Sequence, residues 1–155
     1  MLFRSSQIAA SEVVAAKCTA SATNTITASD VRINFSVVSF DTHGVVTTGA
    51  SWVFTAPVSG IYSINGMLQA SGATYSSGQR VTIYAWVAGV QQELAGIWRA
   101  QTAYSTSIES TFAGTFRMNA GEGLYITAAS NHGSGTLTTS GAGNWITITR
   151  QGGVM

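Results

Sequence analysis

Charged residues are scarce in this chain of 155 residues, and their scarcity excludes two classes of partner. They make up 8% of the sequence, against about 25% in an average soluble domain. Seven basic and six acidic residues leave a net charge of +1, without a run of either sign. A nucleic-acid-binding protein needs a basic stripe to displace phosphate counterions, and an electrostatic membrane anchor needs a basic cluster. We therefore expect no nucleic-acid partner and no membrane partner.

Cysteine and long apolar runs are also rare. Cys18 is the single cysteine, which excludes an intramolecular disulfide and a multi-cysteine metal site and predicts a small apolar side chain within a strand. No segment approaches the roughly 18 apolar residues that a membrane-spanning helix needs. The first residues place Arg4 and then polar side chains where a secretory signal would have an apolar region. We expect a protein without a secretory signal peptide.

Residues that could carry chemistry are few and scattered. His43 and His132 each lie beside a glycine in a predicted turn, and neither has a second histidine or cysteine at a metal-ligand spacing. Glu122 lies between two glycines, a pattern typical of a tight turn rather than of a catalytic carboxylate pair. No Gly-x-Ser-x-Gly motif marks a serine nucleophile. The sequence predicts no catalytic residue, no metal and no cofactor, and therefore a protein that is not an enzyme.

Short runs of β-branched and aromatic residues dominate what is present. The clearest spans residues 80–88, in which side chains alternate with the period of two that a half-buried strand shows. One side of this run holds Val81, Ile83, Ala85 and Val87, and the other holds Thr82, Tyr84 and Trp86. Further predicted strands are Ile33–Phe40, Ser51–Thr55, Gly60–Leu68, Val90–Trp98, Thr106–Met118, Gly123–Ser130 and Asn144–Arg150.

Turn-forming residues separate these runs. The longest stretch of them predicts a loop from Asn131 to Gly143. The only proline, Pro57, fits a bend between two sheets, because proline breaks a central strand. About ten short strands without a long helical pattern predict an all-β sandwich or barrel.

The first residues differ from the rest of the chain. Residues 1–13 contain small side chains and few apolar ones, so they cannot contribute much to a core. We interpret residues 1–13 as an N-terminal arm, helical or extended, that leads into a first strand near Ala15–Ala22. The compact domain then occupies residues 14–155. A frayed terminus is the alternative interpretation of the arm.

Four segments resemble one known family. They are Phe54-Thr-Ala-Pro-Val-Ser-Gly-Ile-Tyr-Ser-Ile64, Phe35 with Asp41, Asn119-Ala-Gly-Glu-Gly-Leu-Tyr-Ile126, and Trp145-Ile-Thr-Ile148. Their pattern resembles the complement C1q-like jelly roll, which is related to the tumour necrosis factor (TNF) fold, over residues 14–151. Val46, Ile64 and Gly66 depart from the pattern because aromatic residues are expected there. The sequence around Asp41 and Phe54 is most similar to that of the C1q-like domains in bacteriophage fibres and other virion proteins.

The resemblance implies a jelly-roll sandwich of two sheets that assembles into a homotrimer. Tyr84 and Trp86 on the second face of the 80–88 strand, with Tyr125 on a later strand, are the predicted trimer interface, because aromatics on a solvent-facing strand indicate a contact surface. In the alternative, Tyr84 and Trp86 face the core beneath a covering loop. Low charge favours the assembly, since a monomer with so few charges risks poor solubility.

Two functions follow from these observations. The first is a virion structural protein of a bacteriophage: a trimeric head decoration, head-fibre or tail-fibre module, attached to other virion proteins through the arm. The second is a carbohydrate- or receptor-binding module for host attachment. In that case Tyr75, Trp98 and Tyr104, which lie in or near predicted loops, would stack on a host surface glycan.

Overall fold

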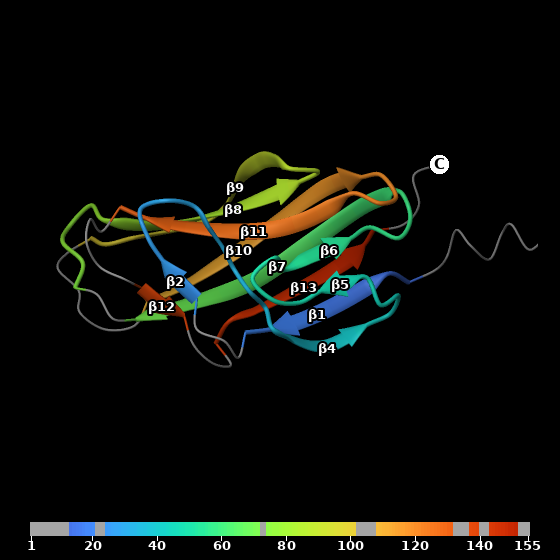
Figure 1. The fold of residues 1–155 in the computed structure, drawn as a ribbon. Coiled ribbons are helices and arrows are strands. Elements are labelled where there is room, and N and C mark those ends of the chain that lie inside the picture. The colour runs from blue at the N-terminus through green and yellow to red at the C-terminus, as the bar shows by residue number, and fades with distance from the viewer. Residues whose placement is uncertain are drawn as a thin grey trace, which may run out of the picture.

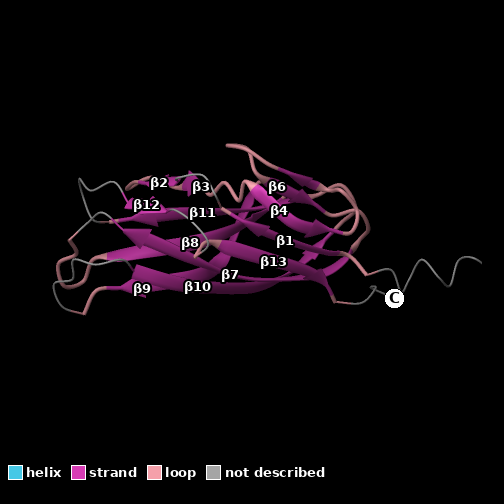
Figure 2. Ribbon diagram, turned by 90° about the horizontal axis from the view of Figure 1, so that it is seen from below, coloured by secondary structure: helices cyan, strands magenta, loops and turns pink. Residues whose placement is uncertain are grey.

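The computed structural model describes residues 13–20, 24–71, 74–101, 108–131, 137–139 and 143–151. These residues form a sandwich of two antiparallel sheets with thirteen strands and no helix (Figures 1 and 2). The described residues accordingly include no helix of the length and apolar character that would cross a bilayer. The predicted all-β jelly-roll sandwich is confirmed.

One sheet has seven strands. In spatial order these are β2 (Asn24–Ile26), β12 (Leu137–Thr139), β7 (Gly60–Ser71), β13 (Trp145–Arg150), β1 (Ala15–Thr19) and β4 (Val37–Asp41), with β10 (Ile108–Met118) on the other side of β7. The pairing of β10 with β7 is the longest in the molecule, from Ile108 opposite Ala70 to Met118 opposite Gly60.

The second sheet has six strands. Their order is β5 (Val46–Thr47), β6 (Val53–Thr55), β11 (Gly123–Ser130), β8 (Arg80–Val87) and β9 (Val90–Arg99), with β3 (Val31–Arg32) also paired to β11. The chain passes from β6 in this sheet to β7 in the other through the bend at Pro57, as the sequence predicted.

The core lies between the sheets and follows the predicted alternation. In β8, Val81, Ile83, Ala85 and Val87 are buried. In β7, the residues facing the core are Tyr62, Ile64, Gly66 and Leu68. Burial of such apolar side chains, at about 25 cal/mol per Å² removed from water, is the main force that holds the two sheets together.

The strand pair that carries the family resemblance closes one part of this core. Phe54 and Tyr62 are both fully buried, and their ring centroids lie 5.6 Å apart. The hydroxyl of Tyr62 donates a hydrogen bond of 2.6 Å to the carbonyl of Val58, which satisfies its polar end inside the protein. Burial raises the pKa of Tyr62 above its usual value.

Gly66, where the family pattern has an aromatic residue, is explained by its neighbour. A Cβ atom at Gly66 would lie 2.3 Å from Cζ of Phe112 and 2.4 Å from the carbonyl oxygen of Trp145. Phe112 pairs with Gly66 across β10 and β7 and is itself buried. The aromatic ring is therefore supplied by the adjacent strand, and only glycine leaves room for it.

Two predictions about the strands were wrong, and several short strands were not predicted at all. The predicted loop 131–143 contains β12, which pairs with β2 and β7. The strand expected at Ile33–Phe40 begins only at Val37, because residues 33–36 lie outside the sheet ladders. Two- and three-residue strands such as β2 and β3 were not anticipated. Of the predicted arm, residues 1–12 lie outside the described residues, and Val13 is exposed.

Candidate functional site

The outward face of the six-stranded sheet carries the aromatic residues that the sequence placed there. Tyr84 and Trp86 are half-buried, while Ile83 and Ala85, which alternate with them along β8, are fully buried. The alternative in which the two aromatics face the core is therefore wrong. Tyr125 of β11 is the register partner of Trp86, so the three residues predicted for an interface share one face.

Trp86, Tyr125 and Arg32 form a stack that we call the aromatic ladder. The rings of Trp86 and Tyr125 are nearly parallel, at 8°, with centroids 5.7 Å apart. The guanidinium carbon of Arg32 lies 3.5 Å from the Tyr125 ring centroid, a cation–π contact. The indole N–H of Trp86 donates to Oγ1 of Thr127 at 2.9 Å. Each member of the ladder thus has a partner within one protomer.

Of the three aromatics predicted in or near surface loops, the structure brings two, Tyr75 and Trp98, into contact with each other. Tyr75 is only 1% exposed and packs edge-on against Trp98 at 4.7 Å between centroids, so its role as a glycan-stacking surface residue is wrong. The physical reason for this burial is that the largely apolar ring is more stable in the core than in water. Burial raises the pKa of Tyr75 to about 12. Trp98 is half-buried in β9, and Tyr104 lies outside the described residues.

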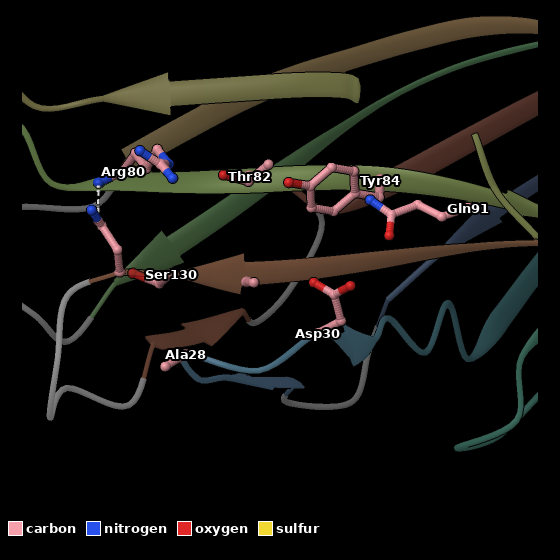
Figure 3. A pocket seen from close by; sticks show the side chains of 9 residues that line it. Ala28, Asp30, Arg80, Thr82, Tyr84, Gln91 and Ser130 are labelled. Carbon is pink, nitrogen blue, oxygen red and sulfur yellow. Dashed lines mark hydrogen bonds between the residues drawn. The ribbon is translucent and has the colours of Figure 1, made fainter. Parts of the chain in front are cut away.

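A pocket of about 340 Å³ opens on the same face as the aromatic ladder. Its lining comes from β8, β11, the start of β9 and the segment before β3 (Figure 3). The residues are Ala28, Asp30, Arg80, Thr82, Tyr84, Gln91, Ala129, Ser130 and Asn131. Sequence reasoning missed this group because its members are far apart in the chain and only the strand pairing brings them together.

The outward face of the seven-stranded sheet has a different character, and we call it the threonine face. Its residues on β10, β7 and β13 are Thr111, Ala113, Thr115, Ser63, Asn65, Met67, Trp145, Thr147 and Thr149. None is charged. The nearest charged side chains are Glu109 and Arg117 toward the ends of β10, and Lys17 of β1, which lies opposite Thr147. A hollow of about 370 Å³ lies beside Trp145 and Ala113.

Two groups that could act as a nucleophile or an acid, Cys18 and Glu122, are accounted for by their surroundings. Burial raises the pKa of the Cys18 thiol to about 11, so the sulfur stays protonated. The carboxylate of Glu122 accepts hydrogen bonds from the backbone and side-chain amides of Asn119, at 2.8 and 2.9 Å, which fix the predicted turn. Among the described residues, no three histidine, cysteine, aspartate or glutamate side chains gather where they could hold a metal ion.

Comparison with known proteins places the fold. No protein-family model and no curated protein matches the chain. Among solved structures, murine APRIL at pH 5.0 is similar over 90% of this chain and 100% of that one, with a TM-score of 0.62 and 10% identity. Eiger TNF from S. frugiperda covers 92% of this chain and 95% of its own, with a TM-score of 0.62 and 9% identity.

The globular domain of the zebrafish complement 1qA protein is similar over 88% of this chain and 94% of its own. Its TM-score is 0.60 and its identity 12%. At such low identity the similarity establishes the architecture and nothing finer. The chain therefore has the C1q/TNF-like jelly-roll fold that its sequence motifs predicted.

Proposed function

We propose that this chain is a non-enzymatic structural protein of a bacteriophage virion. It forms a homotrimeric head decoration, head-fibre or tail-fibre module that projects the jelly roll from the particle. The C1q/TNF-like fold supports the trimer, and the similarity of the segments around Asp41 and Phe54 to virion proteins supports the location. The scarcity of charge supports an assembly in which part of the surface is covered.

The threonine face is the observation that most directly supports a trimer. A solvated sheet face usually bears charged side chains among its polar ones. Here the outward central residues of β10 are Thr111, Ala113 and Thr115, and the edge of β10 is packed against β9 near Gly96. Small uncharged side chains cost less to remove from water than charged ones, and they let two copies approach closely. We assign the interface to this face.

The aromatic ladder, where the sequence predicts the interface, is the competing location. Its rings already stack on each other, and the indole N–H of Trp86 is hydrogen-bonded within the protomer. Covering the ladder would therefore satisfy no group that lacks a partner, and it would remove the guanidinium of Arg32 from water. The interface at Tyr84, Trp86 and Tyr125 stays a prediction, which one experiment separates from ours.

That experiment is light scattering with circular dichroism on the full chain and three glutamate variants. We expect a trimeric wild type and a folded, dissociated Ala113→Glu, because burying a charge at the interface carries a desolvation cost of several kcal/mol. Ala120→Glu is the matched control: the same change in the exposed turn between β10 and β11 should leave the trimer intact. Trp86→Glu should also remain trimeric.

The other outcomes are equally informative. A monomeric wild type at micromolar concentration contradicts the trimer. Dissociation of Trp86→Glu together with a trimeric Ala113→Glu would move the interface to the aromatic ladder.

A further inference from the structure

We propose that the pocket beside Tyr84 binds a neutral sugar residue of an oligosaccharide. The inference goes beyond a structural role, and it rests on the proposed function in one respect. The outward face of the six-stranded sheet must stay uncovered in the trimer, as it does when the interface is the threonine face.

The walls of the pocket are fixed by hydrogen bonds. On one side, the amide of Ser130 donates to the carbonyl of Thr27 at 2.8 Å, and the amide of Ser29 donates to Oγ1 of Thr27 at 3.2 Å. These bonds hold the segment that carries Asp30 against β11. At the end of the pocket, the amide of Arg80 donates to Oδ1 of Asn131 at 2.6 Å. A site that is ordered before binding loses less entropy when its ligand arrives.

The polar groups of the pocket suit hydroxyl groups. Asp30 supplies a carboxylate acceptor, Arg80 a guanidinium donor, and Gln91 an amide that both donates and accepts. The hydroxyls of Thr82 and Tyr84 also do both. A sugar hydroxyl is donor and acceptor at once, so this mixture can satisfy several neighbouring hydroxyls of one ring.

The charge balance of the pocket selects a neutral ligand. One carboxylate and one guanidinium line it, at Asp30 and Arg80, and the remaining lining residues are uncharged. An anionic ligand would meet the carboxylate, and a cationic one the guanidinium, so either would lose part of its attraction. A polar ligand without net charge gains hydrogen bonds from both.

Tyr84 gives the pocket an apolar surface as well. Figure 3 shows the ring of Tyr84 and the carboxylate of Asp30 on opposite sides of the same space. The flat C–H face of a sugar can pack on such a ring while its hydroxyls reach the polar groups. The volume of about 340 Å³ lies at the lower end of the roughly 300–1,000 Å³ that ligand sites occupy, which suits one or two sugar rings.

The test uses saturation-transfer NMR and calorimetry on the full chain with neutral methyl glycosides. The panel contains the glycosides of glucose, galactose, mannose, rhamnose and N-acetylglucosamine at millimolar concentration. We expect at least one to bind with a Kd on the order of 1 mM, because a single ring makes few contacts. Asp30→Asn and Tyr84→Ala should each weaken binding at least tenfold.

Two matched substitutions on the seven-stranded sheet serve as controls. Glu109→Gln removes an exposed carboxylate from β10, and Phe40→Ala removes a ring that is 46% exposed on β4. Both should bind the sugar as the wild type does. Circular dichroism checks that every variant is folded, and Tyr84→Phe, which keeps the ring, replaces Tyr84→Ala if the latter unfolds.

Light scattering on the same samples separates this proposal from the trimer. A monomeric wild type whose sugar binding depends on Asp30 contradicts the trimer and supports the sugar site. A trimeric wild type that binds none of the glycosides overturns the sugar site alone, and so does binding that survives both pocket substitutions. Dissociation of Tyr84→Ala would show that this face is the interface, which overturns both proposals.

Discussion

At the scale of single residues, close approaches between the strands leave little room for change. Gly66 lies where β10 and β13 both pack against β7, with a ring on one side and a carbonyl oxygen on the other. Gly123 is less confined, because a Cβ there would meet only a methyl group of Val53 at 2.9 Å. A side chain can rotate away from such a contact, whereas the backbone of a paired strand cannot.

We therefore expect Gly66→Ala to lower the free energy of unfolding by about 2–3 kcal/mol, the usual cost of overpacking a core. Gly123→Ala, the control, should lower it by less than half as much. Urea denaturation followed by circular dichroism gives both values from the midpoints. Equal effects of the two substitutions would contradict the steric explanation.

Cys18 shows how burial controls reactivity. The side chain is 0% exposed, and desolvation raises its pKa to about 11. At pH 8 only about one thiol in a thousand is then ionised, and the thiolate is the nucleophile. We expect no reaction of the folded protein with Ellman's reagent at pH 8 and one equivalent after unfolding in guanidinium. Rapid labelling of the folded protein would contradict the buried position.

The burial of a single aromatic residue was harder to predict from the sequence than the burial of side chains along a long strand. The alternation in β7 and β8 separated buried from outward side chains correctly, since a strand of eight or more residues repeats its period several times. Tyr75 has no such repeat around it, because it lies in a short bridge between longer strands. Its burial against Trp98 depends on tertiary packing that local sequence does not encode.

At the scale of elements, long strands were predictable and short ones were not. β10 and β11 were found almost to their ends, because each carries its own hydrophobic pattern. β2 and β12 have three residues each and exist as strands because they pair with each other and β12 with β7. The pocket beside Tyr84 could not be predicted for the same reason, since pairing between distant segments creates it.

The turn between β10 and β11 combines local sequence with electrostatics. Gly121 adopts a φ of 87°, which favours glycine. Hydrogen bonds from the amides of Asn119 hold the pKa of Glu122 below its usual value. A depressed folded-state pKa means that the carboxylate stabilises the fold above the pKa of the unfolded chain. That stabilisation is lost as the pH falls through the folded-state value.

Accordingly, Glu122→Gln should have a lower Tm than the wild type at pH 7, and the difference should be smaller at pH 3, because protonation of the wild-type carboxylate increases toward acid pH. Glu109→Gln, an exposed change within β10 and away from the turn, is the control and should not reproduce this pattern. Thermal unfolding, followed by circular dichroism at pH 3 and pH 7, measures the difference in Tm between each variant and the wild type. A Tm difference that is equal at pH 3 and pH 7 would show that the charge of Glu122 does not matter.

At the scale of the whole molecule, the two ends of the sandwich differ. β1 begins and β13 ends side by side, where the amide of Arg150 donates to the carbonyl of Val14 at 2.9 Å. β8 begins and β11 ends at the opposite end of the sandwich, and there Arg80 and Asn131 line the pocket (Figure 1). A module attached near Val14 would thus present the pocket away from its attachment point, as a projecting virion protein with a ligand site requires.

This arrangement makes the arm testable apart from the domain. Deleting residues 2–13 leaves in place every buried core residue that the structure describes. It also spares the bond between Arg150 and Val14 and the pairing of β1 with β13 and β4. We expect the shortened chain to fold and to form the same trimer, because the threonine face is untouched.

If the arm anchors the trimer, the shortened chain should no longer bind to particles of its virus that lack the protein. Cosedimentation with such particles measures this binding, and Trp86→Glu, a full-length variant that keeps the arm, is the control that should still bind. Normal decoration by the shortened chain would show that the domain itself carries the attachment surface.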